Sequence, residues 1–261
     1  MNSLSIGSTG MLAQQLNVEV ISNNIANMTT TGFKRQRAEF QDLLYQSLVR
    51  VGSTSSASGT IVPAGVQIGT GVETSAVYRI HQQGNMQVTD NPLDIAINGE
   101  GFFQIELPSG VTAYTRAGSL QLNPQGELVT PDGFRVVGPG TVPIDAVNIE
   151  INQDGELIIA IDGQVAPINA GQIQLAIFAN DAGLEAVGDN LFLETPASGT
   201  PGVGAPNTAG YGRINQGMLE SSNVNIVSEI TQLITAQRAY EMNSKVITTT
   251  DQMMQSVTNL R

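Results

Sequence analysis

Apolar residues recur every seven positions at both ends of this chain, and this spacing restricts its fold more than any other feature. The N-terminal column is Leu4, Met11, Val18 and Ile25, and the C-terminal column is Ile226, Leu233, Tyr240, Ile247 and Met254, beside which Ile230 begins a second, mostly polar column. A seven-residue repeat keeps one stripe of a helix facing a partner helix. We therefore expect long helices within residues 1–30 and 220–261 that form a coiled-coil-like unit.

Two explanations of these narrow stripes are open. A heptad stripe ordinarily packs a helix on the core of its own protein. Here the striped helices stand at opposite ends of the chain, and at a rise of 1.5 Å per residue each would be long for a modest β domain to cover. We therefore favour packing between subunits, and the residues of the two columns, with Ile230, are the candidate subunit-packing residues.

The central residues, 76–219, alternate apolar and polar side chains as β-strands do. The alternation runs through 93–107 and 147–161; it is broken by Asn98-Gly99 and Asp154-Gly155, and Asp162-Gly163 follows it. Such dipeptides between alternating runs are typical of two-residue hairpin turns. The sequence thus predicts a mixed fold, in which the terminal helices flank a central antiparallel all-β domain. Residues 197–212, rich in Gly, Pro and Ala, are expected to form a surface loop.

The formal net charge of −12 arises entirely in the centre of the chain. Residues 76–220 hold 4 basic and 16 acidic side chains, and 4 − 16 = −12. The neutral ends can pack against copies of themselves without accumulated repulsion, whereas an acidic domain is best placed facing solvent. An acidic chain without basic clusters also argues against nucleic acid as a partner.

No constellation of residues points to catalysis. The chain has no cysteine, which excludes thiolate chemistry and Cys-based metal sites. His81, the only histidine, stands in a polar run, has no Gly-x-Ser-x-Gly elbow to serve, and is expected on the surface. Gly69-Thr70-Gly71 and Gly99-Glu100-Gly101 lack the remainder of a phosphate loop. We predict no catalytic residue, no cofactor and no metal, although nothing in the sequence rules out a glycoside-cleaving pair among the central carboxylates.

The N-terminal sequence shows no basic region followed by an apolar block, and no apolar run approaches the ~20 residues of a membrane span. A product found outside the cytoplasm would therefore need an export route that reads no cleavable signal. The lack of cysteine suits a chain that is exported unfolded, because it cannot become cross-linked on the way.

Residues 31–75 follow neither the helical nor the strand pattern. Within 51–71 Ser, Thr and Gly are frequent and no helical period is present, which is typical of a flexible linker. Ile61, Val66 and Ile68 are nevertheless too apolar for a purely solvated tether. An extended arm that becomes ordered against a neighbour fits both features, so the composition leaves linker and arm open.

Two further motifs stand at opposite ends of the chain. The first is Ser22 to Asn27 followed by Thr31-Gly32-Phe33-Lys34, and the second is Ser222-Asn223-Val224 followed by Gln237 to Glu241 and Asn243-Ser244-Lys245. Together they resemble the signature of the flagellar axial family, which comprises rod and hook proteins, and the similarity continues through Gly99–Phe103 and Tyr114–Gly118 to cover nearly the whole chain. The residues matched to the family motif are Asn23, Asn24, Ile25, Ala26, Asn27, Gly32, Phe33, Gln237, Arg238, Tyr240 and Asn243.

Within this family the chain is most similar to the subunits of the distal rod, through its length and through residues 67–72 and 249–254. The resemblance implies a structural subunit that self-assembles into a rigid hollow drive shaft, transmits torque to the hook and conducts exported subunits. It also implies that the stretch at about 46–71 stiffens the tube. The residues assigned to this stiffening arm are Tyr45, Pro63, Gln67, Gly69 and Gly71.

The partners that the resemblance implies are further copies of the chain in a helical homopolymer, proximal rod proteins, hook protein, the surrounding P and L ring proteins and, during assembly, the rod cap and the flagellar export apparatus. The implied location is the flagellar basal body, spanning from the periplasm to the outer membrane. The nearest alternative is a proximal rod or hook subunit of the same family. The alternative from another class is a secreted glycan-binding or hydrolytic β-domain protein.

Overall fold

The structure, a computed structural model, describes residues 2–49, 64–161 and 166–259. The chain divides into two compact units. Unit 1 comprises Met1–Ile25, Gln36–Tyr78 and Asn225–Arg261, and unit 2 comprises Ala26–Arg35 and Arg79–Val224. The predicted mixed fold, two terminal helices and a central antiparallel β domain, is confirmed.

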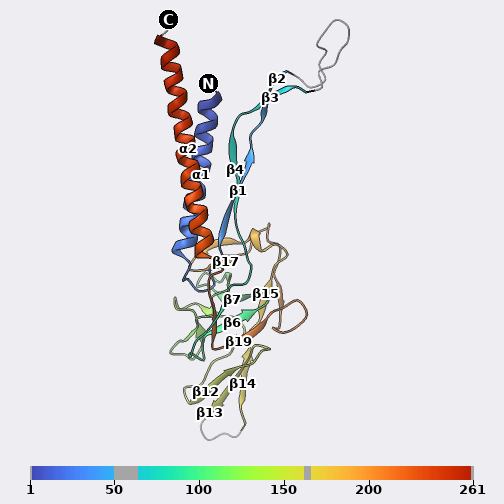
Figure 1. Cartoon of the computed structure of the whole chain (residues 1–261). Helices are drawn as coiled ribbons and strands as arrows, with labels where there is room; N and C mark the ends of the chain where they lie inside the picture. The colour runs from blue at the N-terminus through green and yellow to red at the C-terminus, as the bar shows by residue number, and fades with distance from the viewer. Residues whose placement is uncertain (1, 50–63, 162–165, 260–261) are drawn as a thin grey trace. The chain divides into compact units, whose positions relative to one another are not determined.

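Unit 1 contains two long helices, α1 (Asn2–Ala26) and α2 (Ile226–Asn259), which lie side by side and run in opposite directions (Figure 1). Glycines on α1 allow the close approach. A Cβ atom at Gly7 would stand 2.9 Å from Cγ1 of Ile247, and one at Gly10 would stand 2.8 Å from Nδ2 of Asn243. Among the helices described, none is both long enough and apolar enough to cross a membrane.

The rest of unit 1 is a two-stranded antiparallel ribbon. Strand β1 (Gln36–Asp42) pairs with β4 (Val72–Arg79), whose last residue belongs to unit 2, and β2 (Tyr45–Val49) pairs with β3 (Val66–Gly69) (Figure 1). A two-stranded ribbon buries little apolar surface, so its hydrophobic side chains stay in contact with solvent. Tyr45, Leu48 and Val66 are all exposed.

Unit 2 is an assembly of antiparallel sheets. The largest has nine strands in the order β16-β17-β8-β7-β11-β10-β9, with β15 also paired to β7 and β18 paired to β15; the others are β12-β13-β14, β19-β6 and β20-β5. The bounds are β5 Met86–Val88, β6 Ile95–Asn98, β7 Phe102–Glu106, β8 Thr112–Thr115, β9 Gln121–Leu122, β10 Leu128–Val129, β11 Arg135–Val136, β12 Ala146–Ile151, β13 Glu156–Ile161, β14 Ile168–Gln172, β15 Leu175–Ile177, the 3₁₀ turn η1 Asp181–Gly183, β16 Glu185–Gly188, β17 Leu191–Leu193, β18 Gly202–Gly204, β19 Arg213–Gln216 and β20 Met218–Glu220.

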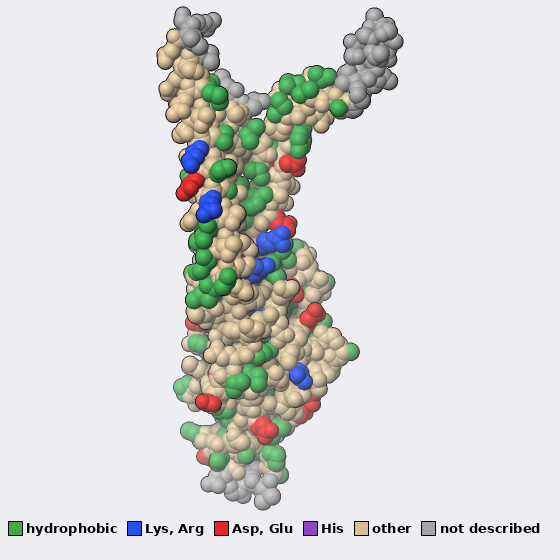
Figure 2. All heavy atoms as spheres, in the orientation of Figure 1, with side chains coloured by type: hydrophobic (Ala, Val, Ile, Leu, Met, Phe, Trp, Pro, Cys, Tyr) green, Lys and Arg blue, Asp and Glu red, His purple; other side chains and the backbone are tan. Residues whose placement is uncertain are grey.

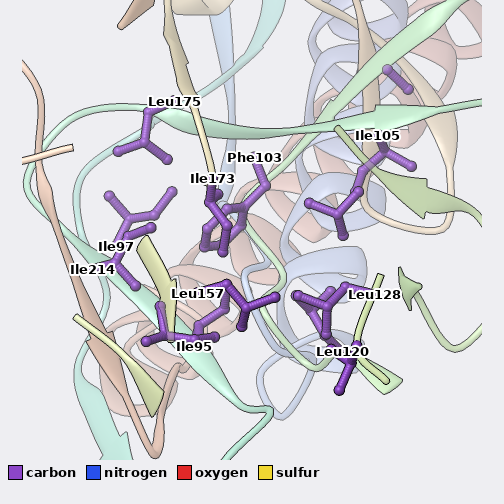
Figure 3. Packing of buried hydrophobic residues seen from close by; sticks show 14 of the residues in the cluster. Ile95, Ile97, Phe103, Ile105, Leu120, Leu128, Leu157, Ile173, Leu175 and Ile214 are labelled. Atoms are coloured by element: carbon purple, nitrogen blue, oxygen red, sulfur yellow. The ribbon is translucent and has the colours of Figure 1, made fainter. Parts of the chain in front are cut away.

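The core of unit 2 gathers aliphatic side chains around Phe103 (Figure 3). Leu175 in β15 is paired with Phe103, Ile173 belongs to the same cluster, and Leu157 comes from the small sheet β12-β13-β14. These side chains are fully buried. The core therefore joins the large and the small sheets into one unit.

One predicted hairpin is confirmed and another is wrong. Strands β12 and β13 pair around Asp154-Gly155, with Ile151 opposite Leu157. In contrast, β6 and β7 flank Asn98-Gly99 but do not pair with each other, because β6 pairs with β19 and β7 pairs with β8. A Cβ atom at Gly99 would lie 2.8 Å from Cα of Gly212, so the chain turns there to pack against the entry to β19.

One smaller expectation needs correction, and another falls on residues that the structure does not describe. Residues 197–212 were expected to be a surface loop, yet they contain β18, which pairs with β15, and Ser198 is buried. The turn predicted at Asp162-Gly163 lies outside the described residues, although β13 and β14 on either side of it do pair.

Candidate assembly site

The contact between α1 and α2 includes Gly7 and Gly10, which lie against Ile247 and Asn243 of α2. The buried residues of α1 are Gly7, Ala13, Val20, Ile21 and Asn24. The residues of the predicted column, Leu4, Met11, Val18 and Ile25, are only half-buried. Small residues in the contact bring the helix axes together, and this leaves the larger apolar side chains at the margins of the helix pair.

On α2 the predicted column divides into two groups. Leu233 and Ile247 are half-buried, whereas Ile226, Ile230, Tyr240 and Met254 are between 43% and 44% exposed. Further apolar side chains of α2 are more exposed still, among them Met242 at 67% and Val227 at 75%. Hydrophobic side chains thus lie open along the helix (Figure 2). An exposed apolar row of this length on one helix is typical of an interaction surface.

A groove runs between the two helices about halfway along α1. It has a volume of about 610 Å³ and is lined by Gln15, Val18, Glu19, Gln237, Tyr240 and Glu241. Val18 and Tyr240, two predicted subunit-packing residues from opposite ends of the chain, therefore border the same hollow. The assignment of these side chains to subunit contacts stays a prediction.

The motif residue Asn24 fastens the end of α1 to two other parts of unit 1. Its Oδ1 accepts a hydrogen bond from the backbone N–H of Gln36 at 2.8 Å, and its Nδ2 donates to the Gln36 carbonyl at 2.8 Å. The same Nδ2 donates to Oε2 of the buried Glu229 at 3.1 Å. Asn24 thereby holds the beginning of β1 and the first turns of α2 together.

The other motif residues of the helices are placed as follows. In α1 and just beyond it, Asn23 and Ala26 are exposed, and Ile25 and Asn27 are half-buried. In α2, Gln237, Arg238 and Tyr240 are exposed, and Asn243 is half-buried where it faces Gly10. Of the exposed motif residues of α2, Gln237 and Tyr240 line the groove and Arg238 does not.

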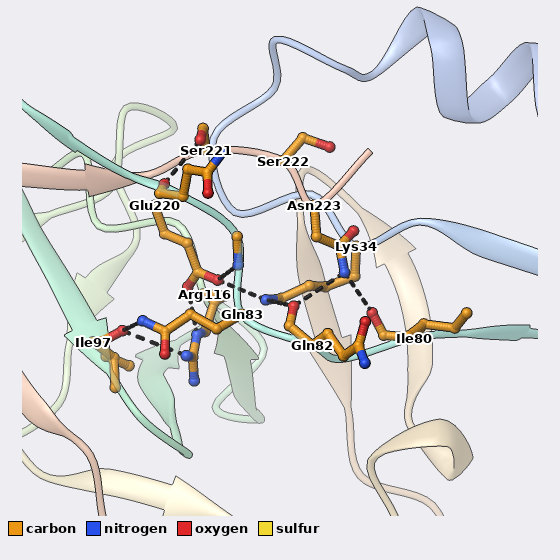
Figure 4. Close-up of polar contacts among 12 residues, drawn as sticks. Lys34, Ile80, Gln82, Gln83, Ile97, Arg116, Glu220, Ser221, Ser222 and Asn223 are labelled. Atoms are coloured by element: carbon orange, nitrogen blue, oxygen red, sulfur yellow. Dashed lines mark hydrogen bonds and ion pairs between the residues drawn. The ribbon is translucent and has the colours of Figure 1, made fainter. Parts of the chain in front are cut away.

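In unit 2, Lys34 of the first end motif forms a buried ion cluster with Arg116 and Glu220 (Figure 4). Lys34 Nζ lies 2.7 Å from Glu220 Oε1, and Arg116 Nε lies 2.7 Å from Glu220 Oε2. The side chains are exposed by only 2%, 5% and 1%, respectively. Such buried charges are tolerated only when each is paired and hydrogen-bonded.

The remaining hydrogen bonds of the cluster are made to backbone groups of neighbouring segments. Lys34 Nζ donates to the carbonyl of Gln82 at 2.8 Å, and Glu220 Oε1 accepts from the N–H of Gly84 at 2.7 Å. The Arg116 guanidinium donates to the carbonyls of Gly99 and Gly101. One carboxylate therefore fixes the segments around residues 34, 84, 99 and 116.

The electrostatics of the cluster follow from burial and mutual attraction. Burial lowers the pKa of Lys34 below its ordinary value, and the adjacent Glu220 carboxylate opposes that shift. Burial alone would raise the pKa of Glu220, but Arg116 and Lys34 together hold the pKa of this carboxyl below its usual range. The cluster is thus built to keep Glu220 ionised.

Gly32 and Asn223, each from an end motif, complete this junction. The N–H of Gly32 donates to the backbone carbonyl of Glu220 at 2.8 Å, and Gly32 has a φ of +70°. A Cβ atom there would lie 2.8 Å from the backbone nitrogen of Ala117, so only glycine fits. Asn223 Oδ1 accepts from the N–H of Arg35, and Asn223 Nδ2 donates to the Ile80 carbonyl. The neighbouring motif residue Phe33 is half-buried.

Arg116 and Glu220 could not be recognised from the sequence as partners of Lys34, since 186 residues separate Lys34 from Glu220. The usable signal was the position of Lys34 and Arg116 inside the motif stretches, in a chain with only 13% charged residues. In such a chain, a lone charge within a motif favours a buried pair.

The residues assigned to the stiffening arm lie in or beside the ribbon. Tyr45 is the pairing partner of Gly69, and Gln67 is the partner of Ser47. Gly71, with a φ of +139°, lies against Thr9 of α1 within unit 1. Pro63 lies outside the described residues.

His81 was expected on the surface, and the structure corrects this. Its ring makes edge contacts with Phe102 and Phe192 at centroid distances of 5.5 and 5.7 Å, and its Nδ1 is buried without a hydrogen-bond partner. Burial, followed by the charges of Lys34, Arg79 and Arg116, lowers the pKa of His81 to about 4. The residues next to His81 in the sequence are polar, so they give no sign of the aromatic rings of Phe102 in β7 and Phe192 in β17 that surround it.

Comparison with known proteins identifies the family. The profile described as flagellar hook protein FlgE/F/G D1 domain matches residues 96–159, that of the flagellar basal body rod FlgEFG protein C-terminal region matches 215–260, and that of the flagella basal body rod protein matches 4–34. The chain is also 60% identical to the flagellar basal-body rod protein FlgG of Caulobacter vibrioides, with 100% of both chains covered. The chain belongs to the flagellar basal-body rod family.

More distant members agree in length as well as in sequence. The FlgG proteins of Agrobacterium fabrum and Bacillus subtilis are 54% and 40% identical to the chain, and the alignments cover 97% and 100% of it and 97% and 99% of the relatives. The resemblance drawn from the end motifs is therefore confirmed. As a member of the rod family, the chain is a structural protein of the flagellar basal body and not an enzyme.

Proposed function

We propose that this chain is a subunit of the distal rod, and that it polymerises through α1 and α2 into a rigid hollow shaft which transmits torque from motor to hook and conducts exported subunits. The exposed apolar side chains of the two helices carry this proposal. Ile230 and Tyr240 are 44% and 43% exposed in a unit that has no other described helix to cover them. Burial of such side chains between copies is worth roughly 25 cal/mol per Å² of apolar surface.

The acidic unit 2 is proposed to form the outside of the shaft. Its surface carries nearly all of the net negative charge of the chain, which repels further copies and favours solvent. The surrounding P and L ring proteins would meet this surface. A rotating shaft needs a smooth contact of low affinity there, and an evenly charged surface provides one.

The ribbon β1–β4 and β2–β3 is proposed to stiffen the shaft by contacting neighbouring subunits. Its strands have two open edges, and Leu44, Tyr45 and Leu48 are 87%, 58% and 60% exposed. Edge strands with exposed apolar side chains pair readily with other chains. Deletion of residues 46–71 should give shafts that are shorter or that bend, and straight shafts of normal length would contradict the stiffening role.

The remaining proposed partners follow from a place between motor and hook. They are proximal rod proteins on one side, hook protein on the other, and the rod cap and export apparatus during assembly. The location proposed is the basal body from the periplasm to the outer membrane, reached by export without a cleavable signal. The family relationship to rod and hook proteins supports this placement, since axial proteins that share end motifs can share helix-to-helix contacts.

A pair of substitutions tests assembly through the helices. Ile230→Glu and Tyr240→Glu place charge on the exposed apolar row of α2, and each should abolish polymers in electron microscopy and sedimentation velocity. Ile144→Glu is the matched control, because Ile144 is 99% exposed but lies in unit 2. Polymerisation by both α2 variants would contradict the proposal.

A further inference from the structure

Resting on the proposed function, we propose that the groove between α1 and α2 receives one specific surface of a second copy: the face of α2 that bears Arg238, Met242, Lys245 and Val246. The groove and this face, which we term the basic ridge, adjoin along α2 at Glu241, but Tyr240 of the groove and Met242 of the ridge point in nearly opposite directions. The contact is therefore between unlike surfaces, and each copy offers one of each.

Helix geometry separates the two surfaces. Met242 follows Tyr240 by two positions, and at 3.6 residues per turn this is a rotation of roughly 200° about the helix axis. Tyr240 lines the groove, so Met242 points away from it. Met242 and Val246 are 67% and 48% exposed, and together they form the apolar part of the basic ridge.

Charge selects the basic ridge as the occupant of the groove. Glu19 and Glu241 border the groove and are exposed, while Arg238 and Lys245 flank Met242 on the ridge and are also exposed. In the part of the chain that the structure describes, none of these four side chains forms an ion pair. An acidic rim around an apolar floor and a basic rim around an apolar ridge are complementary in both respects.

The side chains that line the groove also suit the apolar part of the basic ridge. Val18 and the ring of Tyr240 offer apolar surface at the margins of the helix pair, and Gln15 and Gln237 offer amides beside it. Met is an unbranched side chain that fills irregular gaps and makes favourable contacts with aromatic rings. A groove of about 610 Å³ is large enough to take the Met242 side chain with neighbouring side chains of the ridge.

A contact between unlike surfaces has a consequence for assembly. A like-to-like contact closes after two copies, whereas a groove-to-ridge contact leaves one free groove and one free ridge unless the copies close into a ring. Where the rotation between copies closes no ring, the oligomer grows into an open helical polymer with two different ends. The polarity of a shaft would then be built into a single helix pair.

Disulfide cross-linking of the full-length chain tests this arrangement, because the natural chain has no cysteine. The double variant Gln15→Cys/Met242→Cys should yield a ladder of oxidised oligomers, whereas either single variant should yield none. Mixing the two single variants should yield dimers and nothing larger. Gln15→Cys/Ser109→Cys is the control, with Ser109 exposed in the turn between β7 and β8, and should give no ladder.

Charge reversal provides the second variant. Arg238→Glu/Lys245→Glu, added to the cysteine pair, should reduce cross-linked product at least tenfold, and further addition of Glu19→Lys/Glu241→Lys should restore it. Dimers from Met242→Cys alone would show a like-to-like contact and overturn the proposal. Polymers that form without any groove-to-ridge cross-link would also overturn the groove-to-ridge contact, but they would not contradict assembly through the helices. Failure of the natural chain to polymerise would instead count against the proposed function itself.

Discussion

Asn24 and Glu229 form a buried hydrogen bond of 3.1 Å although 205 residues separate them in the chain. Asn24 also exchanges two hydrogen bonds with the backbone of Gln36. An asparagine side chain has the donors and the acceptor that this position needs, and no other residue of its size has both. The family motif is thus explained here by architecture, since one amide joins α1, β1 and α2.

Replacing Asn24 with aspartate should destabilise unit 1 by at least about 2 kcal/mol. The variant loses the donor to Gln36 and to Glu229, and it places a second carboxylate beside a buried one. Chemical denaturation followed by the helical circular dichroism signal measures the change. Ser22→Asp, at an exposed position in the same turn of α1, should change stability by less than about 0.5 kcal/mol. Equal effects of the two substitutions would show that Asn24 has no special role.

Removing the Glu220 carboxylate should cost about 3–5 kcal/mol, because Glu220→Ala leaves Lys34 and Arg116 buried without a counter-charge. The loss is measured as a shift of the unfolding transition of unit 2. Glu127→Ala removes the partner of Arg135 in an ion pair that is partly exposed, with N–O 3.4 Å, and should cost no more than about 1 kcal/mol. A Glu220 variant as stable as the Glu127 variant would contradict the structural role of the cluster.

Substituting Gly32 with alanine should destabilise unit 2 by about 2–4 kcal/mol, through the positive φ and through the clash with the backbone of Ala117. Gly110 separates the two effects. It has a φ of +79° with no atom within 4 Å of a built Cβ, so Gly110→Ala should cost only the conformational part, about 1 kcal/mol. Thermal melts of the two variants side by side measure the difference, and a Gly32 variant no less stable than the Gly110 variant would refute the close approach.

Acid should weaken unit 2 through His81. Its pKa is about 4 in the folded chain and near 6.5 when unfolded, so the unfolded chain binds more protons between these values. Stability therefore falls as the pH drops from about 6.5 to about 4. Because His81 is the only histidine, its imidazole resonances can be titrated directly by NMR. A midpoint near 6.5 would contradict the buried position.

Glu220 also loses stabilising free energy as the pH falls, but in a lower pH range than His81. Its pKa is depressed in the folded chain, so its contribution to stability is present above the unfolded pKa of about 4.5 and is lost as the pH falls through the folded pKa. His81→Asn should therefore flatten the pH dependence between about 4 and 6.5 but leave the steeper loss at lower pH. This contrast separates the two groups.

The two helices and the β-rich centre could be predicted because they depend on local periodicity. The hairpin at Asp154-Gly155 was predictable for the same reason, whereas the pairing of β6 with β19 joins Ile97 to Ile214 and has no local signal. At Ile95–Ile97 every residue is buried, so the alternation that suggested one exposed face was misleading. A strand that is buried on both faces has no polar face, so a period of two does not distinguish it from a strand with one exposed face or from a short buried helix.

The seven-residue columns were informative about helices but not about which face meets the partner helix. Gly7 and Gly10 lie in the contact because they are small, and an apolar count overlooks them. The assembly role of Val18, Tyr240 and the other column residues stays a prediction, as do the proposed boundaries 1–30, 31–75, 76–219 and 220–261. Contacts between copies are not encoded in the periodicity of one chain.

The most direct test of assembly through the terminal helices is an electron cryo-microscopy reconstruction of the polymer formed by the full chain. We expect α1 and α2 of many copies to line the inner wall, with Tyr240 in contact with a neighbouring copy and the acidic surface of unit 2 outside. A wall built from the β strands of unit 2, with the helices free of neighbouring copies, would contradict it.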